Sequence, residues 1–139
     1  MMRFRLTHPQ LLEALGRAGH GSTVLIADSN YAHSTGGHPA AERVHLNLRP
    51  GLLTADQVLE VGLDAIPVEA ASSMVGPDGA DSPAVTGFAA MLDGVPYQRL
   101  QREPFVAAAR SANLAVLIAT GHSRHFANVV LTIGALPDA

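Results

Sequence analysis

Four short apolar segments constrain the fold of this chain more than any other feature of the sequence. They lie at residues 23–27, 66–71, 114–119 and 128–133. The first reads Thr-Val-Leu-Ile-Ala and is bounded by Gly21 and Asp28. A short apolar, β-branched run of this kind is typical of a strand that is buried on both faces of a sheet. The sequence therefore predicts a sheet that other elements cover.

Helical segments alternate with these strands. Pro9 fits the first turn of the first helix, and Thr54 can cap the second. The predicted helices lie at residues 9–18, 55–62, 83–92 and in a segment that Pro104 opens. Two further strands are expected at residues 44–48 and 97–100. We therefore expect an α/β fold over residues 1–139, a single domain with about six strands covered by about four helices.

A long loop at residues 29–41 interrupts this alternation. It is rich in Ser, Gly, His and Asn, and it shows no periodicity. A loop of this length inside a compact domain often has a function or is mobile. The segment 73–82 is expected to form a second loop.

The charged residues exclude several classes of function. The formal net charge is −3, and the nine basic residues are all arginines, scattered from Arg3 to Arg124. This pattern lacks the basic patch that binds nucleic acid, so we expect no nucleic-acid partner. Cysteine and lysine are both absent, which excludes thiolate catalysis and lysine Schiff bases. Any chemistry must come from His, Asp, Glu, Arg and hydroxyl groups.

The sequence also gives an expectation for location. No apolar run approaches the roughly 20 residues that a membrane helix needs. The first ten residues lack the apolar stretch of a secretion signal. We therefore expect no membrane association and a cytoplasmic protein.

Seven histidines raise the hypothesis of a metal site, because neutral imidazole is a common zinc ligand. The candidates are His33 and His38 in one loop, and His122 and His125 in another. No cysteine or ordered carboxylate completes a known ligand spacing, so we predict no metal. A Ser-His-Asp triad is also disfavoured, since no Gly-x-Ser-x-Gly turn is present.

Three separated motifs resemble the RbsD/FucU family of sugar-anomer enzymes, the ribose pyranases and fucose mutarotases. The segment LLEALGRAGHGSTVLIADSNYAHS is similar to the opening of the family, with a Gly-His and an Asp eight residues later, here His20 and Asp28. The stretch REPFVAAARSANLAVLIATG resembles the next motif and places Arg102 at a sugar-contacting position. In the last motif, Phe126 stands where the family has tyrosine, and Asn128 follows.

This resemblance implies a reaction and roles for these residues. Opening a sugar ring needs one proton delivered to the ring oxygen and one removed from the anomeric hydroxyl. Histidine side chains can do either near neutral pH. The resemblance implies His20 as the proton donor and Asp28 as a sugar ligand. It implies that Arg102 and Asn128 hold sugar hydroxyls, and no cofactor is required.

Phe126 is the main departure from the family pattern, because it lacks the tyrosine hydroxyl. His33 and His125 are candidates to supply the missing proton relay. Arg102 and the triplet Ala32-His33-Ser34 resemble the fucose branch more than the ribose branch. The alternative to a mutarotase is a non-catalytic monosaccharide-binding or carrier protein of a sugar catabolic system.

The spacing of His20 and Asp28 suggests that one subunit does not complete the site. If the residues between them form a strand, the two side chains lie about 20 Å apart. Family members form ring-shaped homo-oligomers, decamers among them, and a site shared between neighbouring subunits would resolve the distance. A mean hydropathy of +0.19 fits this expectation, because it leaves apolar surface to cover.

Overall fold

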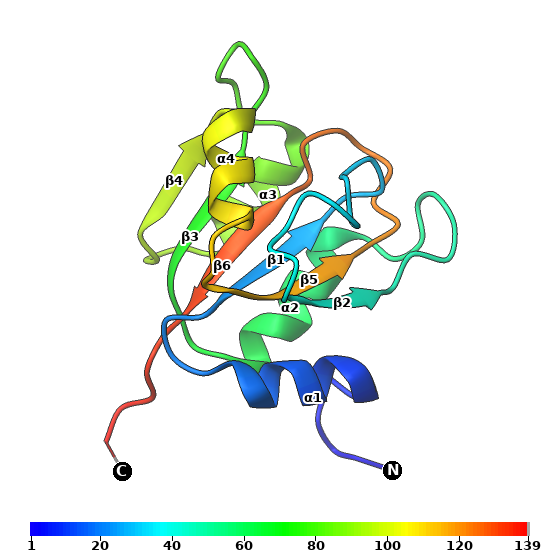
Figure 1. Ribbon diagram of the computed structural model, residues 1–139, viewed down its shortest axis with the longest axis vertical. Helices are drawn as coiled ribbons and strands as arrows, with labels where there is room; N and C mark the ends of the chain where they lie inside the picture. The colour runs from blue at the N-terminus through cyan, green and yellow to red at the C-terminus, as the bar shows by residue number, and fades with distance from the viewer. Residues whose placement is uncertain (139) are drawn as a thin grey trace.

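Six strands form one sheet in the computed structural model, which describes residues 1–138 (Figure 1). The strands are β1 (Thr23–Ala27), β2 (Glu42–His45), β3 (Val68–Met74), β4 (Tyr97–Leu100), β5 (Leu114–Ala119) and β6 (Val129–Ile133). The helices are α1 (Pro9–Ala18), α2 (Ala55–Ala65), α3 (Pro83–Met91) and α4 (Arg102–Ala109). The α/β architecture predicted from the sequence is confirmed, as are the bounds of α1, β1, β4 and β5.

The strand order, which the sequence did not predict, is β2-β5-β1-β6-β3-β4. Strand β6 runs antiparallel to its two neighbours, β1 and β3, whereas the other adjacent pairs are parallel. The N-terminal end of β6 therefore lies at the same edge of the sheet as the C-terminal ends of β1 and β3. This arrangement brings residues just before β6 next to residues just after β1.

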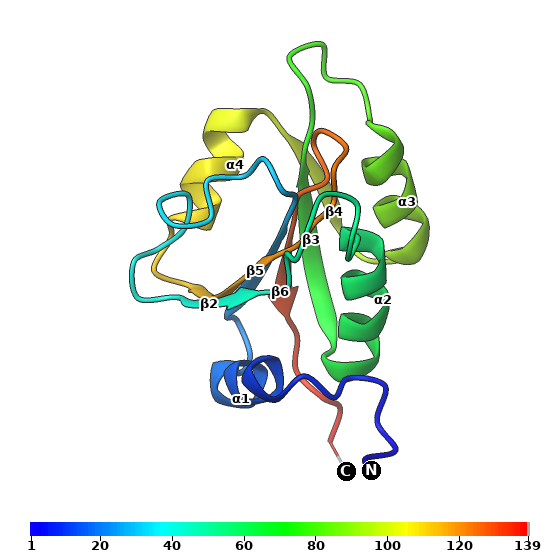
Figure 2. The same cartoon turned by 90° about the vertical axis from the view of Figure 1, so that its right-hand side faces the viewer.

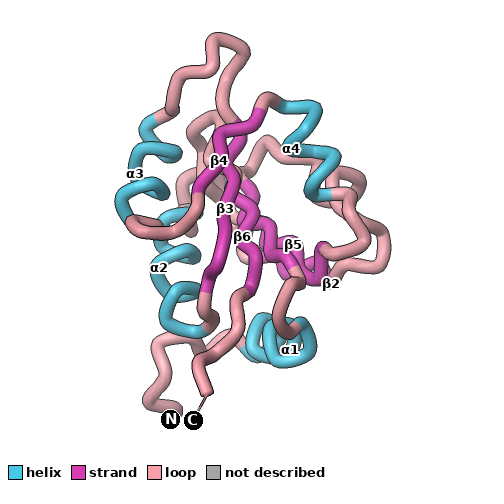
Figure 3. The backbone as a smooth tube through the Cα atoms, turned by 90° about the vertical axis from the view of Figure 1, so that its left-hand side faces the viewer, coloured by secondary structure: helices cyan, strands magenta, loops and turns pink. Residues whose placement is uncertain are grey.

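Helices cover both faces of the sheet. Val24 and Ile26 of β1 pack in a cluster with residues of α1, α2 and α3, whereas Leu25 and Ala27 pack with residues of α4. Figures 2 and 3 show α2 and α3 on one side of the sheet and α4 on the other. The continuous apolar run of β1 thus follows from burial on both faces, as predicted.

Side-chain caps begin three of the helices. His8 Nδ1 accepts from the Leu11 N–H at 3.2 Å at the start of α1. Thr54 and Gln57 form a reciprocal capping box at α2, and the Ser82 hydroxyl caps α3. No helix within residues 1–138 has the length and apolar character needed to cross a membrane.

Strand β2 differs from the prediction of residues 44–48. It ends at His45, and Leu48 is 81% exposed. The reason is that β2 is an edge strand, and β5, its only partner among residues 1–138, ends at Ala119. The segment after β2 packs against Gly121. A Cβ atom at this position would lie 1.8 Å from the Leu52 carbonyl oxygen. Glycine is required there by this close approach.

Three further elements differ from their predicted bounds by at least two residues: α2, which continues to Ala65 and not only to residue 62, β3 and α4. Strand β3 continues to Met74, past the predicted end at residue 71, because Ser73 is buried and its hydroxyl bonds the hydroxyl of Tyr97. Helix α4 begins at Arg102 and not at Pro104. Proline is tolerated inside the first turn, because N–H groups there have no partner within the helix.

The loop at residues 29–41 is held by one arginine of β2. The Arg43 guanidinium donates to four main-chain carbonyl oxygens of the loop at distances from 2.6 to 3.2 Å. These bonds shape a loop that carries no regular secondary structure. Part of it lines the pocket described below.

Candidate functional site

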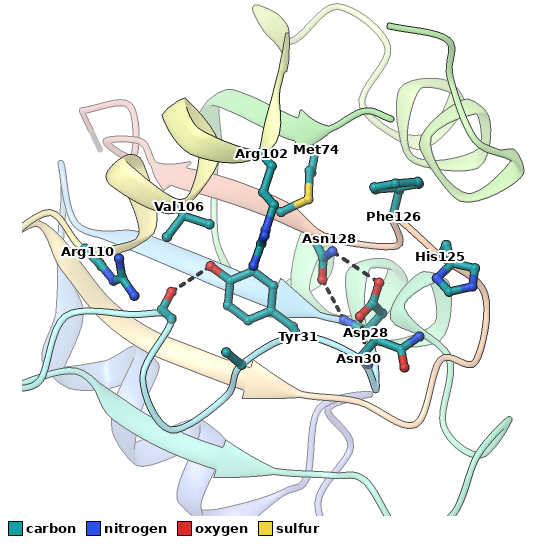
Figure 4. Close-up of a pocket in the computed structure, with 12 residues that line it drawn as sticks. Asp28, Asn30, Tyr31, Met74, Arg102, Val106, Arg110, His125, Phe126 and Asn128 are labelled. Carbon is teal, nitrogen blue, oxygen red and sulfur yellow. Dashed lines mark hydrogen bonds between the residues drawn. The ribbon is translucent and has the colours of Figure 1, made fainter. Parts of the chain in front are cut away.

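A pocket of about 210 Å³ opens at the edge of the sheet where β1 and β3 end and β6 begins (Figure 4). Four parts of the chain line it: the loop after β1, the end of β3, one face of α4 and the turn before β6. The carboxyl ends of parallel strands are a common place for ligand sites in α/β folds. The volume is below that of most drug-sized ligand sites, so a small ligand fits best.

Asp28 and Asn128 form the buried polar centre of this pocket. They are 2% and 3% exposed. The Asp28 N–H donates to Asn128 Oδ1 at 2.8 Å, and Asn128 Nδ2 donates to Asp28 Oδ2 at 3.1 Å. The carboxylate also accepts from the N–H groups of Asn30 at 3.0 Å and Ala127 at 3.1 Å. These bonds fix the carboxylate in one orientation.

Arg102, which the family resemblance places at a sugar-contacting position, lines the same pocket from α4. It lies in the first turn of α4, and it makes no ion pair within residues 1–138. Its guanidinium donors are therefore available to a ligand. Figure 4 shows the side chain extending from α4 into the pocket.

Phe126 lies at the pocket wall, in the turn before β6. Its φ of 58° is the only positive value at a non-glycine position within residues 1–138. Such a backbone conformation costs about 1–3 kcal/mol and is often found at functional sites. The turn directs the Ala127 N–H at Asp28, so this conformation helps to build the polar centre.

The structure does not bring His20 into this pocket. His20 lies in the turn between α1 and β1, at the opposite end of β1 from Asp28. Its ring is 57% exposed, and Nε2 lies 3.0 Å from Glu69 Oε2. His20 and Asp28 of one chain therefore lie at opposite ends of β1, as expected if the residues between them form a strand. Glu69 was not identified from the sequence.

The remaining candidate histidines divide between the pocket and other places. His125 lines the pocket, and its ring centroid is 6.3 Å from that of Phe126. His33 Nε2 lies 2.7 Å from the main-chain oxygen of Asp28, so His33 holds the loop. His122 accepts from the Ala55 N–H and supports the start of α2. Within residues 1–138, no group of three or more His, Asp or Glu side chains could hold a metal ion.

Several pocket residues were missed by the sequence analysis, and Tyr31 and Arg110 are two of them. Burial raises the pKa of Tyr31 to about 12, and the nearby charges of Arg110 and Arg102 oppose this rise. Arg110 follows Arg102 by eight residues, with Val106 between them, so helical spacing alone could have placed all three on one face. No comparable signal in the sequence pointed to Tyr31, because the long loop has no periodicity.

Comparison with known proteins identifies the family. A sequence model of the RbsD / FucU transport protein family matches residues 1–136. The chain belongs to the RbsD/FucU family. The D-ribose pyranase of Symbiobacterium thermophilum is 32% identical to this RbsD/FucU chain over 136 residues, covering 96% of this chain and 98% of the relative. The D-ribose pyranase of Paracidovorax citrulli is 31% identical over 134 residues, with the same coverage.

Solved structures show that this RbsD/FucU protein has the fold of its family. Bacillus subtilis RbsD complexed with D-ribose superposes with a TM-score of 0.86 at 20% identity, covering 99% of this chain and all of that one. The fucose mutarotase of Streptococcus pneumoniae in complex with L-fucose gives a TM-score of 0.81 at 22% identity, with the same coverage. The family resemblance and the RbsD-like sheet predicted from the sequence are confirmed.

Proposed function

We propose that this protein is a sugar mutarotase, which interconverts the anomers or the pyranose and furanose forms of a monosaccharide by acid–base ring opening. The observation that carries the proposal is the buried Asp28–Asn128 pair, which faces a small pocket together with Arg102. The names of the relatives support the same reaction class, because they are D-ribose pyranases.

The polar centre is suited to a sugar diol. A carboxylate has about four acceptor positions, and Asp28 uses three of them within the protein. Its Oδ1 accepts one N–H and keeps a position for a sugar hydroxyl. The unpaired guanidinium of Arg102 can donate to adjacent hydroxyl oxygens. These groups would hold the ring while its anomeric C–O bond opens and closes again.

The proton transfers need groups beyond this diol-binding centre. We assign the proton donor to His20 of a second subunit, because His20 lies at the far end of β1 within its own chain. Glu69, 3.0 Å from the His20 ring, would orient the imidazole. His125 is the histidine that lines the pocket of the same chain, and it is a candidate for the second transfer.

This assignment implies a homo-oligomer with sites shared between subunits, and a decamer fits the family pattern. The test mixes two inactive variants, His20→Ala and Asp28→Asn, after dissociation and reassembly. Mixed assemblies should recover part of the activity, because some sites then combine an intact His20 with an intact Asp28. A monomer in light scattering, or mixtures as inactive as the separate variants, would contradict the shared site.

Two sugars are the first candidates for substrate. The two relatives compared above are named for D-ribose, whereas Arg102 and the triplet Ala32-His33-Ser34 resemble the fucose branch. Saturation-transfer NMR over D-ribose, L-fucose and other aldoses would measure which anomeric exchange the protein accelerates. Acceleration of none of them would contradict the proposal.

Phe126 favours one alternative function. Because its ring lacks a hydroxyl, the pocket could hold a sugar without turning it over, in a monosaccharide-binding or carrier protein. The same NMR experiment separates the two functions. Sugar binding without faster exchange would support the carrier.

A further inference from the structure

The end of the pocket away from Asp28 carries a second polar centre, formed by the Tyr31 hydroxyl and Arg110. Figure 4 shows the Tyr31 hydroxyl directed toward the side of the pocket where Val106 and Arg110 lie. The hydroxyl donates to the Gly36 carbonyl oxygen at 2.6 Å. A phenol hydroxyl has one hydrogen and two lone pairs. Because the Tyr31 hydrogen is donated to Gly36, the Tyr31 oxygen can serve a ligand only as an acceptor.

The position of this acceptor is fixed by packing. The Tyr31 ring meets the buried ring of Phe105 edge to face, with 6.3 Å between centroids. A Cβ atom on Gly36 would lie 2.6 Å from Tyr31 Cε1. Glycine at this place lets the loop close against the ring. The hydroxyl is therefore held in place before any ligand binds.

Arg110 places donors beside this acceptor. Its Nε donates to the Thr35 carbonyl oxygen at 3.2 Å, which anchors the guanidinium to the loop. Arg110 makes no ion pair with a carboxylate in the described part of the chain. Its charge acts on Tyr31, although burial still raises the pKa of Tyr31 to about 12. Tyr31 thus stays protonated at neutral pH and acts as a neutral acceptor.

We infer that Tyr31 and Arg110 together recognise one hydroxyl group of the sugar and select against sugars that carry hydrogen or methyl at that position. A hydroxyl can donate to the phenol oxygen and accept from the guanidinium at once, whereas a methyl group would give no partner to the phenol lone pairs or to the remaining guanidinium N–H groups. This inference rests on the proposed sugar site and narrows its substrates to sugars that keep this hydroxyl.

Matched sugars and matched variants test the inference. The sugars are D-ribose with its 2-deoxy and 3-deoxy derivatives, and L-galactose with L-fucose, which differs from it by a single hydroxyl. Calorimetry should show that the protein prefers the parent sugar of one such pair by about tenfold. Tyr31→Phe should abolish that preference, and Arg110→Gln should weaken it. The control is Tyr97→Phe, which changes the other tyrosine of the chain and should keep the preference.

A spectroscopic measurement separates recognition from a merely structural role. The chain has two tyrosines and no tryptophan, so Tyr31 is the sole source of tyrosine absorption in Tyr97→Phe. Binding of the preferred sugar should shift this absorption, and binding of its deoxy partner should not. Equal shifts for both sugars, or an unchanged preference in Tyr31→Phe, would overturn the inference while leaving the mutarotase proposal intact. If the wild-type protein neither bound any sugar nor accelerated anomer exchange, the inference and the mutarotase proposal would both be contradicted.

Discussion

Asn128 and Asp28, 100 residues apart in the chain, hold each other through two hydrogen bonds, one from the Asp28 main chain and one from the Asn128 side chain. They meet because β6 is antiparallel to β1, so the residue before one strand lies beside the residue after the other. The pair joins the ends of two strands and also presents the carboxylate to the pocket. Substitutions here should therefore change both stability and sugar binding.

Replacing Asn128 by alanine should lower the free energy of unfolding by about 2–3 kcal/mol, because it leaves buried groups of Asp28 without partners. Denaturant unfolding would measure the loss. The matched control is Asn113→Ala at an exposed site, which should change stability by less than about 0.5 kcal/mol. Similar losses for the two variants would contradict the structural role of the pair.

Asp28→Ala should also destabilise the fold, since its carboxylate holds three donors.

Replacing Arg102 by alanine should weaken sugar binding by roughly tenfold to a hundredfold, the range for hydrogen bonds to a charged group. Stability should hardly change, because Arg102 is exposed and makes no ion pair within residues 1–138. Calorimetric titration with the preferred sugar and thermal unfolding would measure the two effects. Normal affinity in this variant would remove Arg102 from the site.

Replacing His20 by asparagine should slow catalysed anomer exchange by about a hundredfold or more, the usual scale for a proton-transfer group. Glu69→Gln should give a smaller loss in kcat with little change in KM, since it acts through the orientation of His20. Exchange NMR would measure both. His45→Asn, at an exposed position on β2, serves as the control. An unchanged rate in His20→Asn would move the proton donor elsewhere, and His125 would be tested next.

Replacing Phe126 by tyrosine should accelerate exchange if the pocket lacks only a hydroxyl. The substitution adds one oxygen atom to a ring that keeps the same shape. If His125 has taken over the proton relay, Phe126→Tyr should change little and His125→Ala should slow turnover. No exchange in the wild type or in Phe126→Tyr, with any aldose, would support the carrier function.

The raised pKa of Tyr31 predicts its alkaline titration. In Tyr97→Phe, absorbance should report ionisation of Tyr31 with a midpoint near pH 12, because burial disfavours the phenolate. The folded protein then binds the Tyr31 proton more tightly than the unfolded chain, whose tyrosine pKa is about 10. The stabilisation is complete below about pH 10 and is lost as the pH rises to about 12. A midpoint near 10 in the folded protein would contradict the burial of this hydroxyl.

The sequence by itself determined most elements of this fold and, through the family resemblance, pointed to candidate residues of the site. Continuous apolar runs such as 114–119 indicated strands covered on both faces, because burial on both sides leaves no polar alternation. Caps such as Thr54 marked helix starts through local hydrogen bonds. The resemblance of three motifs to the RbsD/FucU family pointed to Asp28, Arg102 and Asn128, and the structure brings all three to one pocket.

Only the tertiary structure decided the strand order and the contacts between distant segments. The single antiparallel strand, β6, puts Asn128 beside Asp28, and no local pattern encodes that choice of neighbours. The end of β2 was mispredicted because it depends on pairing with β5, and the end of β3 because it depends on the hydrogen bond between Ser73 and Tyr97. Tyr31 lines the pocket from a loop that has no sequence periodicity. The shape of this loop depends on hydrogen bonds from Arg43. These features depend on contacts between residues far apart in sequence, and such contacts form only when the whole chain packs.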